Sequence, residues 1–215
     1  MKARTLNILC TALGVICHPL WMPTYGTILY CAALQAQYAT LSPAYWWIAI
    51  LGTFALTAFI PLTLILIQWA TGKIASLEIR NPQERTSIYI YTSVCYAFWS
   101  YFLLRVLHAP LVLFIIAVSA IMALLAVIFI NRQWKISAHL TGLGGLIGGI
   151  SAFCLYSSQM LPLGLLAGLL GAALLLMYAR IYTKAHTPLQ VTTGFLFGLL
   201  MTFVPTLIYC LIAHV

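Results

Sequence analysis

Aspartate is absent from this chain of 215 residues, and glutamate occurs only at Glu78 and Glu84. Charged residues of all kinds make up 6% of the sequence, whereas they make up roughly a quarter of an ordinary soluble domain. A soluble fold cannot cover its surface with so few charges, so that class is excluded. The scarcity of acids also leaves ten lysines and arginines at a formal net charge of +8.

Hydrophobic residues account for 64% of the chain and gather in blocks at about 6–33, 46–70, 86–107, 111–130, 140–158, 161–179 and 189–213. A helix of about 20 apolar residues crosses the hydrocarbon core of a bilayer. The sequence therefore predicts an all-α fold, a polytopic membrane helical bundle of six or seven spans, organised as a single integral membrane domain over residues 1–215. The same composition excludes a nucleic-acid partner and makes the lipid bilayer the expected surroundings.

Two prolines interrupt the first apolar block, in the run Cys17-His18-Pro19-Leu20-Trp21-Met22-Pro23. Each proline removes a backbone donor and breaks the helix ladder. The block is therefore either a kinked span or a re-entrant hairpin of two half-helices, and both alternatives stay open. His18 accordingly either hydrogen-bonds the helix break or, in a re-entrant block, lines a functional site.

The cysteines, histidines and glycines are spaced in ways that predict helix packing and no metal site. The six cysteines lie in or near apolar runs without C-x-x-C spacing, so they are interpreted as core residues and not as disulfides or metal ligands. Five scattered histidines with no acid at ligand spacing predict no metal site. Glycines that favour close helix packing occur at Gly142, Gly144, Gly145, Gly148 and Gly149, and in the small-x-x-x-small pairs Gly164 with Gly168 and Gly194 with Gly198.

Basic residues concentrate on one side of the predicted membrane body. Alternate crossings place the connections 71–85, 131–139 and 180–188 on the same face. That face carries seven of the ten positive charges, namely Lys73, Arg80, Arg85, Arg132, Lys135, Arg180 and Lys184. The positive-inside rule alone would make the face cytoplasmic. An anion site that attracts phosphate is the other interpretation, and the charge count does not separate the two.

Three segments on this face bear anion-binding and reactive side chains in a regular order. They are Lys73 through Arg80-Asn81-Pro82, then Ile136-Ser137-Ala138-His139, then Arg180 through His186 to Gln190. Together they resemble the three-part signature of the type 2 phosphatidic acid phosphatase superfamily, the lipid phosphate phosphatases. That signature reads Lys-x6-Arg-Pro, then Pro-Ser-Gly-His, then Ser-Arg-x5-His-x3-Asp. The resemblance covers about residues 73–198, within a phosphatase-like core of about 46–213.

The resemblance implies a set of phosphate-binding residues. Lys73, Arg80 and Arg180 would hold the non-bridging phosphate oxygens, and guanidinium groups suit forked hydrogen bonds to them. Ser137 and nearby backbone N–H groups would add further donors. Such a site needs neither a metal ion nor another cofactor, because fixed cations neutralise the charge that develops on the phosphoryl group.

The resemblance also implies the catalytic roles. His186 would be the nucleophile that forms a phosphohistidine, and His139 the acid that protonates the departing alkoxide. Gln190 stands where the family has an aspartate. Its carbonyl oxygen can still accept the Nδ1 proton of the nucleophile, but it cannot stabilise an imidazolium by charge. Glu78 or Glu84 would have to supply that charge from another loop; an ion pair with Arg80 or Arg85 is the ordinary use of Glu84.

The expected activity is therefore hydrolysis of a lipid phosphomonoester or diphosphate. The family's substrates include phosphatidic acid, phosphatidylglycerol phosphate, undecaprenyl diphosphate and the phosphates of lipid A. The alternative is a weakened or inactive relative that binds or transports a phosphorylated lipid without turnover. A channel or ion-coupled transporter is disfavoured, because the usual intramembrane acids are missing. Most bacterial relatives that the resemblance implies face the periplasm, opposite to the side that charge counting predicts. A re-entrant first block would leave six full spans with the basic face outside, so the expected location is the bacterial inner membrane with the site on the periplasmic face.

Overall fold

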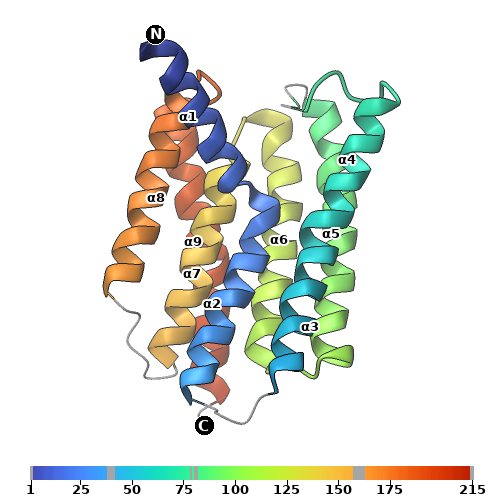
Figure 1. Ribbon diagram of the computed structural model, residues 1–215, viewed down its shortest axis with the longest axis vertical. Helices are drawn as coiled ribbons and strands as arrows, with labels where there is room; N and C mark the ends of the chain where they lie inside the picture. Colours follow the sequence, from blue (N-terminus) through green and yellow to red (C-terminus); the bar gives the residue numbers. More distant parts are fainter. Residues whose placement is uncertain (1, 38–41, 78, 80–81, 157–162, 214–215) are drawn as a thin grey trace. The chain divides into compact units, whose positions relative to one another are not determined.

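The computed structural model of the chain describes residues 2–37, 42–77, 79, 82–156 and 163–213. Nearly all of these residues lie in helices (Figure 1). In chain order the elements are α1 (Lys2–Ile16), the 3-10 turn η1 (Pro19–Trp21), α2 (Met22–Gln37), α3 (Pro43–Phe54), η2 (Ala55–Phe59), α4 (Ile60–Ala70), α5 (Pro82–Tyr101), η3 (Phe102–Val106), α6 (Leu111–Gln133), α7 (Ala138–Tyr156), α8 (Leu163–Tyr182) and α9 (Pro188–Ala213). The segments η2 and η3 are π-helical and continue the α-helices before them.

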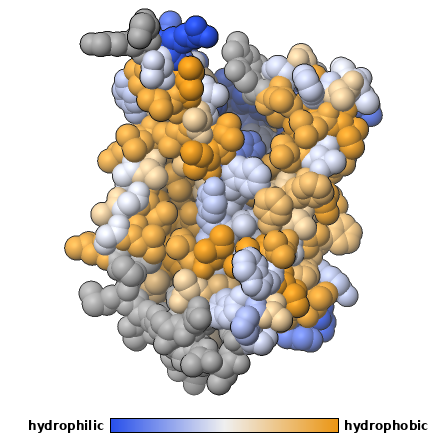
Figure 2. Space-filling view, in the orientation of Figure 1, coloured by the Kyte–Doolittle hydropathy of each residue, from blue (hydrophilic) through white to orange (hydrophobic). Residues whose placement is uncertain are grey.

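Six of the described helical stretches are long and apolar enough to cross a membrane. They are Arg4–Ala32, Pro43–Ala70, Leu111–Gln133, Ala138–Leu155, Leu163–Tyr182 and Pro188–Ala213. Apolar side chains cover much of the helical surface in view (Figure 2). The chain is a multi-pass membrane protein, and the predicted all-α polytopic fold is confirmed. Helix α5 has 20 residues, but its threonine, serine and charged residues keep it outside this apolar set.

Helix starts follow local chemistry. Proline occupies the first position of α3 and of α9, where the missing N–H would have no intrahelical acceptor. The Ser42 hydroxyl accepts from the Tyr45 N–H over 3.3 Å and so caps α3. The ends of the helices are therefore encoded in the short polar connections.

The described chain forms two compact units. The first contains Met1–Met22 and Lys135–Val215, and the second contains Pro23–Trp134. The division into two compact units does not test whether the chain is a single integral membrane domain, so that expectation stays a prediction. All six cysteines are buried as free thiols, in agreement with their interpretation as core residues.

In the first unit, α7 and α9 form the most extensive helix pair, and glycines make their close approach possible. A Cβ atom on Gly198 would overlap the Thr141 carbonyl oxygen, and one on Gly144 would overlap the Phe195 carbonyl oxygen. Gly148 meets the Leu199 carbonyl in the same way. The predicted packing role of these glycines is confirmed, since any side chain here would force the backbones apart.

The glycines of α8 behave differently from the prediction. A Cβ atom on Gly164 or Gly168 would meet no described atom within 4 Å, and the same is true of Gly171. Their small-x-x-x-small spacing therefore does not bring α8 against another described helix. The prediction of close packing was wrong for this pair, because spacing places residues on one helix face but does not say which face is buried.

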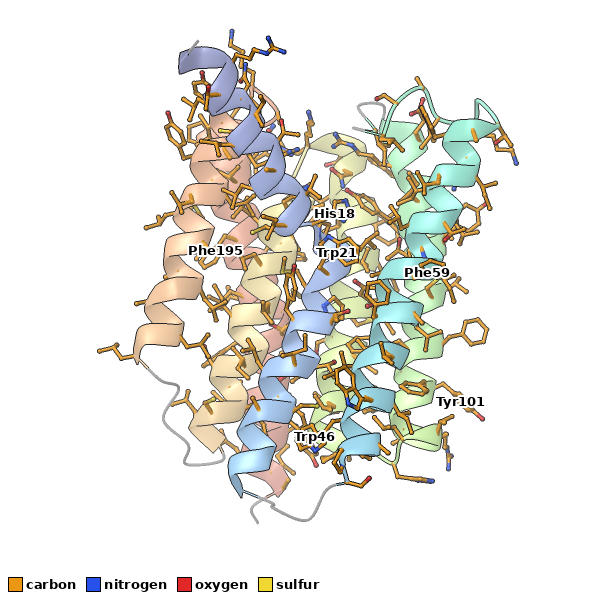
Figure 3. All side chains as sticks on the ribbon, viewed as in Figure 1. His18, Trp21, Trp46, Phe59, Tyr101 and Phe195 are labelled. Atoms are coloured by element: carbon orange, nitrogen blue, oxygen red, sulfur yellow. The ribbon has the colours of Figure 1, made fainter. Side chains whose placement is uncertain are left out.

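The helix of the first apolar block is interrupted at one place, between α1 and α2. Arg4–Ala32 counts as one stretch long enough to cross the membrane, and only η1 and the residues just before it depart from α-helical geometry. The Val15 carbonyl accepts from the His18 N–H over 3.2 Å and from the Trp21 indole over 2.9 Å, so both bonds join the two sides of the break. Figure 3 labels His18 and Trp21 at this break. The break is therefore short and local, and the kinked span and the re-entrant hairpin both stay predictions.

Candidate functional site

The candidate site lies at one end of the first unit, where three helix termini meet. Helices α7, α8 and α9 run antiparallel in sequence order (Figure 1). The start of α7 at Ala138, the end of α8 at Tyr182 and the start of α9 at Pro188 therefore share one end of the unit. The connections 135–137 and 183–187 carry the predicted polar residues to this place. We call it the polar end, made of Ser137, His139, Arg180, His186 and Gln190.

The tautomer of His186 is set by Gln190. The His186 Nδ1 lies 3.2 Å from the Gln190 Oε1. The same Oε1 accepts from the Thr187 backbone N–H over 3.1 Å. Because a backbone N–H can only donate, the amide atom at this position is the oxygen, and the His186 Nδ1 must carry the proton. The lone pair of the imidazole is therefore on Nε2.

Gln190 also has a purely structural use. The Thr187 hydroxyl accepts from the Gln190 N–H over 3.4 Å, while the Gln190 side chain accepts from the Thr187 N–H. This reciprocal pair is a capping box at the start of α9. One side chain thus closes the helix end and orients His186, so the glutamine retains the orienting part of the role expected of aspartate.

Ser137 lies directly before α7 and is completely buried. Its N–H donates to the Gln190 carbonyl over 3.4 Å, and an added Cβ on Gly194 would stand 2.8 Å from its carbonyl oxygen. The glycine therefore lets α9 lie against the residue that precedes α7. Within the part of the chain that the structure describes, the Ser137 hydroxyl has no hydrogen-bond partner. A buried donor at the start of a 19-residue helix is the kind of group that binds an anion.

His139 and Arg180 face the same region from α7 and α8. The charge of Arg180 and the ring of His186 both act electrostatically on His139. His139 also bonds to the backbone of Gly14, and an added Cβ on Gly14 would stand 3.8 Å from the Arg180 Nη1. Helix α1 therefore lies next to α8 at the polar end and contacts both His139 and Arg180. Two imidazoles and one guanidinium are brought together from residues that lie 41 and 6 positions apart in the sequence.

Lys135 is a residue that the sequence analysis counted only as a surface charge. Its Nζ donates to the Ala185 carbonyl over 2.9 Å. Ala185 directly precedes His186, so the lysine ties the connection after α8 to the connection before α7. The only available signal was its place two residues before Ser137, which does not by itself reveal a contact 50 residues away.

The predicted catalytic and phosphate-binding residues are only partly found together in the first unit. Ser137, His139, Arg180, His186 and Gln190 belong to the polar end. Lys73 belongs to the second unit, where its side chain is exposed. Arg80 lies outside the described residues. The Glu84 carboxylate accepts from the Ala75 N–H over 3.4 Å, and the Arg85 Nε donates to the Ile79 carbonyl, so both side chains hold their own loop.

Charge at the polar end has one sign. The first unit contains no aspartate or glutamate, so every charged side chain in it is basic. The amino ends of α7 and α9 add the positive ends of two helix dipoles and first-turn N–H groups without intrahelical acceptors. Taken with the serine hydroxyl, these groups favour an anion.

No protein-family model, no curated protein and no solved structure matches this chain. Its function is therefore inferred from the chemistry of the polar end.

Proposed function

We propose that this protein is a membrane lipid-phosphate phosphatase that hydrolyses a lipid phosphomonoester or diphosphate through a phosphohistidine on His186. The observation that carries the proposal is the pair of bonds to the Gln190 Oε1. They place the His186 proton on Nδ1 and its lone pair on Nε2, which is the tautomer that a nucleophile requires. A buried serine and a basic side chain at the same helix termini support a phosphate as the electrophile.

The reaction follows from the order of these groups. The His186 Nε2 attacks phosphorus while the bond from phosphorus to the lipid oxygen breaks, and protonated His139 gives its proton to the departing oxygen. His139 then accepts a proton from water as that water attacks the phosphohistidine, which releases phosphate and restores His186. Arg180, Ser137 and the first N–H groups of α7 hold the non-bridging oxygens through both steps. The resemblance to the lipid phosphate phosphatases names Lys73 and Arg80 as the further phosphate-binding residues.

Gln190 is expected to slow the reaction relative to an enzyme with aspartate. The amide oxygen orients His186, but it is neutral. It therefore gives less stabilisation to the positive charge that forms on the imidazole when Nε2 bonds to phosphorus.

The substrate is proposed to be a lipid because the polar end lies at the termini of three membrane-spanning helices. Large apolar side chains such as Leu174 and Leu175 are exposed on α8, so acyl or prenyl chains can stay in the hydrocarbon while the head group reaches the site. Phosphatidylglycerol phosphate, undecaprenyl diphosphate, phosphatidic acid and lipid A phosphate all have this chemistry. We place the enzyme in a bacterial inner membrane with the site on the periplasmic face.

A second candidate is a protein that binds or transports a phosphorylated lipid without turnover. The observation that favours it is the neutral Gln190, whose capping box gives it a structural reason to be present without catalysis.

A phosphate-release assay on purified protein with these four lipids tests the proposal. We expect release by the wild-type protein and a loss of roughly 1,000-fold or more in His186→Asn, as for removal of a catalytic nucleophile. His108→Asn is the matched control, since His108 lies in the connection between η3 and α6 of the second unit. Release from none of the lipids would overturn the proposal. Lipid-phosphate binding that Arg180→Gln abolishes, together with zero turnover, would establish the second candidate.

A further inference from the structure

His18 has a role that goes beyond capping the helix break. It is the N-cap of η1, with extended backbone angles of φ −67° and ψ 138°. Its Nδ1 accepts from the Leu20 N–H over 3.4 Å. Because Pro19 has no N–H, the Leu20 amide is the first donor after the break, and the imidazole satisfies it.

This bond sets the tautomer of His18. The Leu20 N–H can only donate, so the accepting Nδ1 carries no proton and the neutral ring carries its proton on Nε2. A doubly protonated ring would lose the bond to Leu20. It would also place a second positive charge in the field of Arg180, which already acts on both His18 and His139.

The ring of His18 is held firmly next to His139. The two ring centroids are 5.2 Å apart, with an angle of 83° between the ring planes. The turn that carries His18 is packed against α7, because an added Cβ on Gly142 would stand 3.1 Å from Pro19. The Trp21 indole bonds to the Val15 carbonyl and ties the two sides of the break together. His18 therefore cannot rotate away without losing its cap.

We propose that His18 is a positioning residue that holds the His139 imidazole in the orientation needed to protonate the leaving group. The edge-to-face contact blocks rotation of the His139 ring, and the Gly14 backbone holds the ring from α1. One nitrogen of His139 is thereby directed at the backbone and the other remains for the departing oxygen. This role rests on the proposed function, since it is the phosphatase reaction that needs an acid at this place.

His18→Asn separates positioning from capping. Asparagine is among the best N-cap residues, so the variant keeps an acceptor for the Leu20 N–H while the ring beside His139 is removed. His18→Ala removes both the acceptor for the Leu20 N–H and the ring beside His139. The difference in thermal stability between His18→Ala and His18→Asn therefore measures the contribution of the cap alone.

The test compares two leaving groups. A lipid alkoxide needs a proton as it departs, whereas the nitrophenolate of p-nitrophenyl phosphate leaves without one. For His18→Asn we expect kcat/KM to fall about 10-fold with a lipid phosphate and to change less than about twofold with p-nitrophenyl phosphate. Equal losses on both substrates, or no loss on either, would overturn the positioning role. We expect His186→Asn to lose activity on both substrates. If the wild-type protein is as inactive as His186→Asn, the proposed function is wrong.

A measurement without turnover tests His18 even in that case. In protein with ¹⁵N-labelled histidine rings, at a pH where the His139 ring is neutral, we expect His139 to show one tautomer in the wild type and averaged tautomers in His18→Asn. Averaged signals already in the wild type, or a single tautomer that survives in the variant, would contradict the proposal. A wild-type His18 protonated at Nδ1 would contradict it as well.

Discussion

One polar cluster from each unit shows two ways of burying polar side chains. In the second unit a hydroxyl cluster, made of Thr27, Thr53, Thr57 and Trp99, is bonded within itself. The Trp99 indole donates to the Thr53 hydroxyl over 3.0 Å, and the Thr27 hydroxyl lies 3.3 Å from the same oxygen. In the first unit the polar end gathers ionisable rings, a guanidinium group and a buried serine hydroxyl without a described hydrogen-bond partner.

This difference distinguishes polar side chains that hold helices together from polar side chains that bind or transform a ligand. Neutral groups that satisfy one another join helices without any ligand, as threonines commonly do between membrane helices. Ionisable groups at membrane depth are costly, and their presence usually marks a binding or reaction site. We therefore expect substitutions in the hydroxyl cluster to change stability and substitutions at the polar end to change turnover.

Gln190→Leu tests this comparison with the largest expected effect. The substitution removes the oxygen that holds the His186 Nδ1 proton, so phosphate release should fall roughly 100-fold, within the range for general acid–base contributions. Gln190→Glu is the control, because it keeps both bonds and adds a charge that stabilises the imidazolium, and its release should at least equal that of the wild type. Wild-type release by the leucine variant would show that Gln190 only caps α9.

Gly198→Ala probes the helix pair that supports the polar end. The new methyl group overlaps the Thr141 carbonyl oxygen, so α7 and α9 must separate, at a cost of about 2 kcal/mol in unfolding free energy, typical of overpacking. The control is Gly168→Ala on α8, where the methyl group meets no described atom within 4 Å. Thermal unfolding in detergent distinguishes the two. An equal loss of stability in both variants would mean that the glycine pattern, and not the contact, sets the effect.

Lys135→Met asks whether the bond to Ala185 positions His186. Without that donor the connection after α8 is less restrained, so kcat should fall about 10-fold, as expected when a nucleophile is slightly misplaced. The control is Lys184→Met, which removes one positive charge from the connection after α8, where the lysine is exposed. Equal losses of kcat in the two variants would point to the overall charge of the polar end instead of the bond.

Thr53→Val should have the smallest effect and only on stability. Valine keeps the shape of threonine but leaves the buried Trp99 N–H without its acceptor, which costs about 1–2 kcal/mol. Phosphate release per folded molecule should be unchanged. Thr63→Val is the matched control, since the Thr63 hydroxyl is exposed and donates to the Phe59 carbonyl of its own helix. A loss of turnover in Thr53→Val at full stability would remove the distinction between the two regions.

Some features of the candidate site could be predicted from sequence because they are local. The four-residue step from His186 to Gln190 spans a helix start, so the glutamine oxygen reaches the ring. Other features depend on distant contacts. The pairs Gly144 with Gly148 and Gly164 with Gly168 have the same spacing, yet a Cβ on either glycine of the first pair would overlap a carbonyl group of α9, whereas one on either glycine of the second pair would meet no described atom.

His18 also combines a feature that can be predicted from the sequence with a contact that cannot. The sequence offered a choice between a helix-break role and a place in the site, and the structure gives its ring contacts of both kinds. The break itself is local, because prolines remove backbone donors wherever they occur. The contact with His139 joins residues 121 positions apart, and no periodic pattern encodes such a distance.

Composition by itself determined that this protein is helical and crosses a membrane, because a chain with two acids and long apolar blocks has no other way to satisfy its backbone and side chains. Only the tertiary structure decided which helix faces are buried and which polar groups meet. Burial depends on the partner that each face finds, and Ser137 and His139 contact helices that are far apart from them in the chain. The physical reason is that hydrophobicity acts along every segment, whereas hydrogen bonds and close contacts act only between atoms that the fold brings together.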